Sequence, residues 1–463
     1  MADEPSTAAR SGWRPSFLVR GACAASVVVI TAAALTVPAT HPVSAKAQAV
    51  PTTTQPAVTA LGNGAWSWFG DPRAVRVTGQ RDQDVVGWID THGGVTVEAI
   101  DRRTGQQQKV VLGHLPEDDH SDPSLLVEPD KRITAFYSGH SGKHMVYRTT
   151  VRPEDVSAWG PRHTLTSNTP GRLGYTYPNP VMLPSEDNRL WLFWRGGNWE
   201  PTFATRSSDG HWSSAKGLIG SPGRQRPYLK VASNGRDRIA LAFTDGHPRD
   251  VQSSIYYAEY RHGELWTASG KSLGRPGALP IHPSHAEIVY DAKSSGVRAW
   301  VHDVAYDAQG RPVIVFATFP SKANHEYWYA RWTGGRWDLH QIVGAGPSIS
   351  DAERLNSPGR APNHAEQQYS PGIVLDPKDP SVVLLSRKIG STRQVERWTT
   401  PDGGSSWQHQ ALTDGAGVDS IRPVVVREAA NATGRSSDVA WLSGRYGAWW
   451  DYGTKVVLER GGL

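Results

Sequence analysis

One structural unit recurs along most of the chain: a short apolar strand, a polar turn that often holds Asp or Gly with Arg, and a second apolar strand. Seven copies can be aligned, and they begin near residues 73, 123, 180, 227, 301, 371 and 422. Most copies are followed by a third strand, such as MVYRTT, SIYYAEYR, YWYARW or VERWTT. A single unit of this kind cannot bury its own apolar face, so the copies must pack against one another.

The strands are short and rich in Val, Ile, Tyr and Trp, and turn residues separate them, which predicts antiparallel β-sheet. The spacing of the copies fits propeller blades of about 40–50 residues with insertions, whereas a solenoid needs shorter and more even repeats. We therefore predict an all-β fold, a seven-bladed β-propeller of four-stranded antiparallel blades. Two alternatives stay open. The first copy can close the ring with the carboxyl-terminal strand KVVLER, which changes the count by one, and a β-sandwich with a second β domain uses the same strands.

Composition narrows the class of protein. The chain has 47 Gly and 33 Pro in 463 residues, which implies many turns and argues against a long helical bundle. Its 19 Trp argue against disorder. The single cysteine, Cys23, excludes a disulfide framework and a cysteine-based zinc site. The net charge of +5 falls to about +3 without the first 48 residues, and no Lys/Arg run marks a nucleic-acid binder.

The amino terminus has the order of a secretory signal peptide. An uncharged, largely apolar stretch from Gly21 to Val37 follows Arg14 and Arg20 and precedes small residues up to position 47. We predict a signal peptide over residues 1–47, a Pro/Thr-rich linker over 48–59 and a single propeller domain over 60–463. The expected product is a secreted monomer without membrane contact after cleavage. The alternative is an uncleaved membrane anchor.

Two turns resemble Asp boxes. Residues 400–407 (TPDGGSSW) fit the pattern Ser/Thr-x-Asp-x-Gly-x-x-Trp, and residues 207–212 (SSDGHW) form a shortened version. In such a turn the carboxylate accepts backbone N–H bonds while the Trp packs between sheets. We therefore predict a structural role for both turns.

The repeat geometry indicates where chemistry can occur. The residue that enters the first strand of a hairpin and the residue that leaves the second lie at the same end of a blade. His, Tyr, Arg and a few carboxylates recur at these positions: His92, His120, His140, Tyr175, Tyr177, Arg195, Arg226, Tyr228, Asp245, His247, His302, Asp303, Glu366, Tyr369, Arg387, Arg422 and Arg445. We interpret this end of the ring as the functional site.

The second to fourth copies carry the densest set of these residues. His120 and His140 flank one hairpin, Tyr177 and Arg195 flank the next, and Tyr228 enters the one after. Arg pairs bidentately with a carboxylate, His exchanges a proton near neutral pH, and Tyr does so beside a cation. This combination suits β-elimination on a uronic acid. A hydrolytic glycosidase usually needs two carboxylates that flank the scissile bond, and no such pair emerges from the blade ends.

The ordered motifs resemble a known family. DDHSDPSLLV with YSGH, TYPNPVML with LFWRGG, and RPYLKVASNG with AFTDGHP look like the BNR-repeat propeller family that contains ulvan lyases, rhamnose–glucuronate lyases and related α-rhamnosidases. The resemblance implies that His120 and His140 are catalytic, that Tyr177 and Tyr228 assist proton transfer or substrate placement, and that Arg195 neutralises the uronate. Tyr175 is an alternative to Tyr177.

The remaining candidates complete the prediction. We expect substrate contacts from further blade-end residues: Tyr175, Arg226, His247, His302, Arg387 and Arg445. The reaction requires no cofactor. The resemblance implies a structural metal held partly by cysteines, which the mature chain lacks, so His247 and His262 are the candidate ligands for a divalent ion.

The predicted function is a secreted polysaccharide lyase that acts on rhamnose–glucuronate glycans of the ulvan or gum-arabic type, and the predicted partner is an acidic polysaccharide. The alternatives are an α-L-rhamnosidase, which hydrolyses the same glycans, and a non-catalytic carbohydrate-binding propeller. A sialidase is disfavoured because its arginine triad would have to come from Arg195, Arg387 and Arg445.

Overall fold

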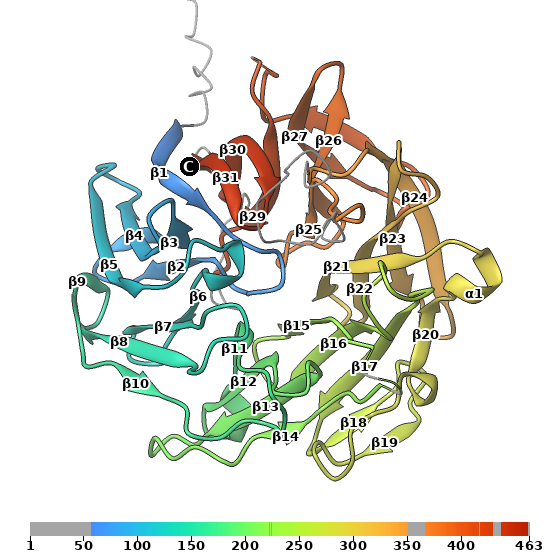
Figure 1. Ribbon diagram of the computed structural model, residues 1–463, viewed down its shortest axis with the longest axis horizontal. Coiled ribbons are helices and arrows are strands. Elements are labelled where there is room, and N and C mark those ends of the chain that lie inside the picture. The colour runs from blue at the N-terminus through green and yellow to red at the C-terminus, as the bar shows by residue number, and fades with distance from the viewer. Residues whose placement is uncertain are drawn as a thin grey trace, which may run out of the picture. The chain divides into compact units, whose positions relative to one another are not determined.

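The computed structural model describes residues 57–221, 223, 225–350, 366–415, 417–428 and 437–461. The predicted signal peptide lies outside these residues, and the first strand, β1 (Ala57–Ala65), begins inside the predicted linker. The described strands form antiparallel sheets arranged around a common centre, which confirms the all-β propeller (Figure 1). In the described part, no helix has the length and apolar character needed to span a membrane.

Five sheets of four to six strands stand alone as blades. The first contains β6 (Ser124–Val127), β7 (Ile133–Tyr137), β8 (Val146–Arg152), β9 (Asp155–Trp159) and β10 (His163–Thr164). The second contains β11 (Thr176–Leu183), β12 (Arg189–Arg195), β13 (Pro201–Arg206) and β14 (Lys216–Gly217). The third contains β15 (Leu229–Ser233), β16 (Arg238–Thr244), β17 (Ile255–Arg261), β18 (Glu264–Trp266), β19 (Ser272–Gly274) and β20 (Glu287–Tyr290). The fourth contains β21 (Ala299–Tyr306), β22 (Pro312–Thr318), β23 (His325–Trp332) and β24 (Trp337–Gly346). The fifth contains β25 (Ile373–Leu375), β26 (Val382–Ile389), β27 (Thr392–Thr399) and β28 (Gln408–Ala411).

The other eight strands form one continuous sheet that contains both ends of the described chain. Besides β1 it holds β2 (Ala74–Thr78), β3 (Asp82–Asp90), β4 (Gly94–Asp101), β5 (Gln107–His114), β29 (Ser420–Val425), β30 (Val439–Ala448) and β31 (Asp451–Arg460). Strand β1 pairs with β31 from Ala57 to Asn63 and then crosses to β3 at Gly64 and Ala65. One strand therefore joins the start of the ring to its end.

The predicted number of blades is wrong. All seven predicted hairpins are antiparallel pairs, from β2–β3 to β29–β30. However, five sheets stand alone rather than seven, because β1 pairs on both sides and fuses the strands around it into one sheet. Two of the five also exceed four strands. The partner of the carboxyl-terminal strand is β1, which precedes the first repeat, rather than the first repeat itself.

Helices in the described part are single turns: η1 (Asp119–Ser121), η2 (Pro184–Glu186), η4 (Pro283–His285) and α1 (Ala292–Ser295). Both Asp-box turns have the structural role that their sequences predict. Asp402 accepts hydrogen bonds from the backbone N–H and the hydroxyl of Ser406, and Trp407 meets Tyr329 of the preceding blade edge-on at 5.4 Å. Trp212 likewise packs on a tyrosine of the preceding blade, Tyr147, with 5.8 Å between the ring centroids and 57° between the planes.

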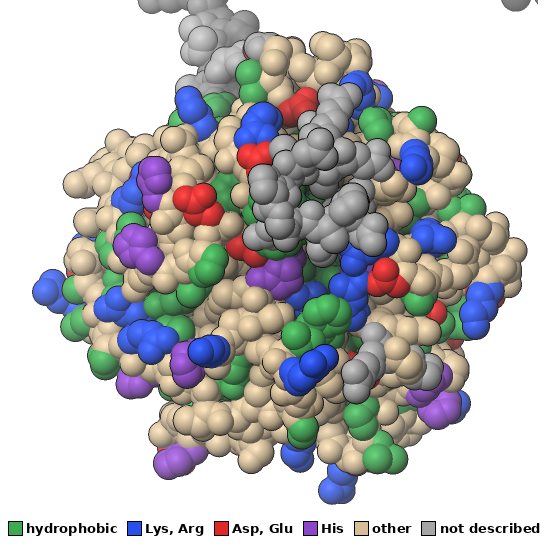
Figure 2. Space-filling model, in the orientation of Figure 1, with side chains coloured by type: hydrophobic (Ala, Val, Ile, Leu, Met, Phe, Trp, Pro, Cys, Tyr) green, Lys and Arg blue, Asp and Glu red, His purple; other side chains and the backbone are tan. Residues whose placement is uncertain are grey.

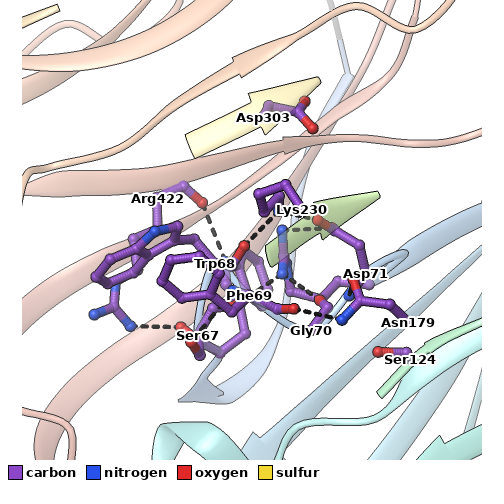
Figure 3. Close-up of polar contacts among 12 residues, drawn as sticks. Ser67, Trp68, Phe69, Gly70, Asp71, Ser124, Asn179, Lys230, Asp303 and Arg422 are labelled. Atoms are coloured by element: carbon purple, nitrogen blue, oxygen red, sulfur yellow. Dashed lines mark hydrogen bonds and ion pairs between the residues drawn. The ribbon is translucent and has the colours of Figure 1, made fainter. Parts of the chain in front are cut away.

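The segment between β1 and β2, residues 66–73, lies against the inner strands of the ring (Figure 3). The backbone N–H of Asp71 donates to Asn179 on β11, and the ammonium of Lys230 on β15 donates to the carbonyl of Trp68 at 2.5 Å. Trp68 also stacks on His302 of β21, with 5.4 Å between the ring centroids. The segment thus fills space toward which the blades converge, and the functional site must lie to one side of it.

Candidate functional site

His120 is held at the start of η1 by the two residues before it. The carboxylate of Asp118 caps this turn and accepts the backbone N–H of His120 at 2.9 Å. The same carboxylate binds Nδ1 of the His120 ring at 2.7 Å, and Asp119 Oδ1 lies 2.8 Å from that nitrogen. All three residues are buried. Because both carboxylates lie against Nδ1, this imidazole is built to carry a positive charge.

His140 lies beside His120 in the loop after β7. Its Nδ1 is 3.2 Å from the second oxygen of Asp118, so one carboxylate bridges both histidines. The two rings stack with centroids 3.9 Å apart and an angle of 7° between their planes. Trp449 meets both rings edge-on, at 5.6 Å from His120 and 5.1 Å from His140. The two imidazoles therefore lie in contact with each other, although His120 is buried.

The two histidines differ in protonation. Burial opposes a charge on His120, but the Asp118 and Asp119 carboxylates outweigh this effect and raise its pKa to about 9. Burial and the adjacent positive charge of His120 lower the pKa of His140 to about 4. Near neutral pH the stack therefore consists of one imidazolium, His120, and one neutral imidazole, His140. A proton donor and a proton acceptor lie side by side.

Tyr177 also stacks on His120, with 5.1 Å between the ring centroids and 28° between the ring planes. It enters β11 at a register shift between Thr176 and Asn179, and its φ of 59° lies in the left-handed region. The side-chain amide of Asn179 donates to the carbonyl of Tyr177 at 2.9 Å and stabilises this conformation. Such bulges redirect side chains at the edges of sheets. Burial raises the pKa of Tyr177 well above its usual value, so its hydroxyl is protonated.

Arg195, at the end of β12, lies over the Tyr177 ring at 4.8 Å. Its Nη1 donates to the hydroxyl of Tyr228 at 3.2 Å, and its buried Nε has no hydrogen-bond partner in the described part of the chain. No carboxylate neutralises this guanidinium among the ion pairs of the described residues. Arg195 is near enough to His140 to contribute to the lowering of its pKa. The five predicted catalytic residues thus form one cluster.

A pocket of about 380 Å³ opens beside His140. Asp118, His140 and Trp449 line it on the side of the histidine cluster, and three basic residues lie on its rim: Lys143, His144 and Arg162. In Figure 2, histidine and basic side chains gather near the middle of this face of the molecule. A separate cavity of about 20 Å³, enough for about one water molecule, is lined by Tyr177, Arg195 and Tyr228.

His247 borders the cluster without joining its hydrogen bonds. Its ring lies 5.4 Å from that of Tyr228, and its Nδ1 accepts the backbone N–H of Arg249 at 3.0 Å. Its Nε2 is 3.6 Å from Glu366, whose other oxygen binds Arg249 at 2.8 Å. Burial and the neighbouring Arg226 keep the pKa of His247 well below its usual value. Arg226 itself pairs with Asp250.

The structure places the other predicted substrate-binding residues elsewhere. Tyr175 packs in the core against Trp194, at 5.6 Å, and donates to the carbonyl of Ser167, so Tyr177 is the tyrosine on the histidine side. His302 is 1% exposed and stacks on Trp68. Arg387 forms a bidentate ion pair with Glu396, and Arg445 forms one with Asp451.

The proposed pair of metal ligands is not brought together. His247 follows β16 and His262 follows β17, and because these strands are antiparallel the two histidines lie at opposite ends of the pair. Within the described residues, the one group with three metal-ligand atoms close together is Asp118, His120 and His140, whose atoms lie within 4.8 Å of one another. Its ring nitrogens contact the Asp118 carboxylate at hydrogen-bonding distances, 2.7 Å for His120 and 3.2 Å for His140.

Sequence reasoning missed the groups that tune the histidines. Asp118 and Asp119 adjoin His120 in the motif DDH, and a carboxylate next to a predicted catalytic histidine is a signal that could have identified them. The repeat pattern selected Arg445 and not the next residue, Tyr446. Because neighbouring residues of a strand point to opposite faces of the sheet, this difference of one position selected the wrong face. Trp449 and Lys143 carry no pattern that distinguishes them before the chain is folded.

Comparisons with known proteins agree with this architecture. Residues 84–345, more than half of the chain, match the sequence family described as BNR repeat-containing family members. None of the curated proteins matches the chain.

Among solved structures, a PL25 ulvan lyase, described as a new family of polysaccharide lyase, superposes with a TM-score of 0.63 at 16% identity and covers 86% of this chain and 93% of its own. A structure of a PL25 ulvan lyase bound to -[GlcA(1-4)Rha3S]- gives the same TM-score and identity over 86% and 94%. The polysaccharide lyase Uly1 gives a TM-score of 0.51 at 13% identity over 86% and 91%. At these identities the likeness shows the fold, and the sequence match shows the family: the chain belongs to the BNR repeat-containing family.

Proposed function

We propose that this protein is a polysaccharide lyase that cleaves uronic-acid-containing glycans by β-elimination. The observation that carries the proposal is the stack of a protonated and a neutral histidine on one carboxylate, with Arg195 close by. An elimination needs a base for the C5 proton, an acid for the leaving oxygen and a cation for the uronate carboxylate. The three roles match His140, His120 and Arg195.

Arg195 is the group assigned to the uronate. Its guanidinium is buried, and its described contacts are to hydroxyl groups and aromatic faces rather than to a carboxylate. A buried guanidinium of this kind gains a strong bidentate partner when a carboxylate arrives. By holding the substrate carboxylate, Arg195 stabilises the negative charge that develops when C5 loses its proton, and Tyr228 holds the guanidinium in place.

The proton transfers then follow from the stack. The neutral His140 takes the C5 proton, and the electrons of the C5–H bond form the C4=C5 double bond. The C4–O bond breaks, and the neighbouring sugar leaves with the oxygen, which receives a proton from His120. The products are an unsaturated uronate and a shortened chain with a free hydroxyl. A proton from His140 to solvent and one from solvent to His120 restore the enzyme.

The surroundings of the site favour an acidic polysaccharide as partner. Lys143 and Arg162 add positive charge to the rim of the pocket beside His140, which attracts an anionic chain. The solved structures with the same fold include ulvan lyases, one of them bound to a glucuronate–rhamnose sulfate repeat. We propose glucuronate–rhamnose glycans as the substrate class. The amino-terminal pattern supports export, so we propose that the enzyme acts outside the cell.

One assay tests the proposal. The mature protein is incubated with a panel of uronate polysaccharides, including ulvan, gum arabic and a neutral glycan, while ultraviolet absorbance of the unsaturated uronate and release of free sugars are measured. Absorbance that rises with the uronate glycans and is lost in His120→Ala and His140→Ala supports the lyase. Free rhamnose without absorbance would identify a hydrolase instead. Binding without turnover, unchanged by both substitutions, would identify a carbohydrate-binding propeller.

A further inference from the structure

We propose that Asp119, Arg422 and Tyr446 are positioning residues that fix the orientation and charge of His120. The inference rests on the proposed function, in which His120 is the proton donor. The three residues come from η1, β29 and β30, so two of the last three described strands support a group in the turn that precedes the first separate blade. Arg422 is among the predicted blade-end residues but was given no role, Asp119 and Tyr446 are not among them, and none of the three lines the pocket.

Each of the three residues is hydrogen-bonded to the other two. Asp119 Oδ2 accepts from Arg422 Nη1 at 2.5 Å and from the Tyr446 hydroxyl at 2.6 Å. Arg422 Nη2 donates to the oxygen of that same hydroxyl at 2.8 Å. The remaining oxygen of Asp119 lies 2.8 Å from Nδ1 of His120. Two donors therefore hold one oxygen of the carboxylate so that the other faces the imidazole.

The cluster is shielded from water. Asp119 is 1% exposed, Arg422 2% and Tyr446 5%. Arg422 also donates to the carbonyl of Trp66, and the indole of Trp66 donates back to the carbonyl of Arg422 at 3.1 Å. Arg422 has a φ of 50° and lies at the register shift in β29, just as Tyr177 has a positive φ and lies at the register shift in β11. A guanidinium fixed at this position keeps Asp119 ionised despite its burial, and the pKa of Asp119 is lowered.

Asp118 alone does not fully stabilise the positive charge of His120, because its carboxylate is shared between His120 and His140. A second carboxylate on Nδ1 of His120 compensates for the desolvation of its charge and fixes the ring plane, which directs Nε2. Other titratable groups also act on His120: Asp118 and Asp122 near η1, His140 after β7, Tyr177 on β11, His247 after β16 and Glu366 before β25. Among the carboxylates of the described residues, Asp118 and Asp119 are the two that lie at contact distance from Nδ1 of His120.

The test uses Asp119→Asn and Tyr446→Phe in the mature protein, with Tyr452→Phe as the matched control. Tyr452 pairs directly with Tyr446 in the sheet, and its buried hydroxyl has no hydrogen-bond partner in the described residues. The titration of His120 is followed by NMR of histidine-labelled protein, which needs no substrate. Loss of the Asp119 charge should lower the His120 titration midpoint by about one pH unit or more, since a buried ion pair shifts a pKa by that amount.

Kinetics supply the second readout. In Asp119→Asn the alkaline limb of kcat should move to lower pH together with the His120 midpoint. In Tyr446→Phe, Asp119 loses one of two anchors, so kcat should fall about tenfold or more with KM unchanged. Tyr452→Phe should match the wild type. A wild-type His120 midpoint in folded Asp119→Asn, or a wild-type kcat in Tyr446→Phe, would overturn the inference.

The outcomes separate this inference from the proposed function. If the wild type makes no unsaturated product from any glycan, the lyase proposal fails, but the NMR titration still reports whether Asp119 sets the charge of His120. If Asp119→Asn does not fold, because it leaves Arg422 buried without a counter-charge, Tyr446→Phe carries the test, since it removes one hydroxyl and keeps every charge.

Discussion

His120 and His140 share a single carboxylate. Oδ1 of Asp118 lies 2.7 Å from Nδ1 of His120, and Oδ2 lies 3.2 Å from Nδ1 of His140, which brings the rings to 3.9 Å. One carboxylate cannot stabilise two adjacent positive charges in a buried site, so the proton goes to the ring that also has Asp119. The proposed division into acid and base therefore arises from a difference of one neighbouring residue, Asp119.

The pH dependence of catalysis should reflect this division. His140 must be neutral to act as a base, so kcat/KM should rise as the pH increases through about 4. His120 must be protonated to act as an acid, so kcat/KM should fall as the pH increases through about 9. Initial rates of absorbance change across this range measure the profile. A single limb near 6.5, the ordinary histidine value, would contradict the assignment.

Asp118→Asn should remove the link between the two histidines while keeping the size of the side chain. The neutral amide cannot stabilise the imidazolium of His120 as the carboxylate does. A smaller fraction of His120 is then protonated and able to donate its proton, so kcat should fall about 100-fold or more. The control is Asp130→Asn, which changes an exposed carboxylate that pairs with Arg132 in the β6–β7 turn. Equal losses in the two variants would show that the effect is not specific to the site.

Arg195→Lys should separate charge from geometry. Lysine keeps the positive charge but loses the planar fork that binds a carboxylate through two parallel hydrogen bonds. We expect kcat/KM on uronate glycans to fall about 100-fold, with a substantial part in kcat, because the interaction strengthens as charge develops at the uronate. Arg206→Lys is the control, since Arg206 pairs with Glu128, which directly follows β6 in another blade. Full activity in Arg195→Lys would rule out a bidentate role.

Lys230→Met tests the buried charged contacts of the segment of residues 66–73. Lys230 is fully buried and contacts Asp71 in the segment of residues 66–73, and Asp303 lies nearby (Figure 3). Removing its charge leaves buried carboxylates with less compensation, which should lower the free energy of unfolding by about 3–5 kcal/mol. Chemical denaturation measures the loss, with Lys271→Met at an exposed position as the control. A loss below about 1 kcal/mol would show that Arg73 and Arg427 suffice for Asp71.

The sequence predicted local pairing better than closure of the ring. Alternating apolar residues and turn signals identified all seven hairpins, since both depend on neighbours in the chain. The fusion of eight strands into one sheet depends on β1, which lies before the repeats and pairs with residues 392 to 403 positions away. Contacts at that separation leave no local periodicity, so the predicted count of separate blades was wrong.

The candidate site shows the same limit. The repeat identified the positions of His120, His140, Tyr177, Arg195 and Tyr228, which lie together, but their catalytic roles stay predictions. It could not tell which ends of inner strands remain open, because the segment of residues 66–73 covers His302. Nor could it resolve a shift of one residue, which exchanges exposed Arg445 for buried Tyr446.

The pairing of β1 with β31 has a consequence for how the protein is made. β31 is the last described strand to leave the ribosome, and until it emerges β1 lacks its main partner. Tyr446 and Arg422, which contact Asp119 beside His120, are also translated after every strand of the five separate blades. A nascent chain that has not reached β31 can therefore form its earlier hairpins but cannot complete the pairing of β1, so the proposed activity would require synthesis through β31.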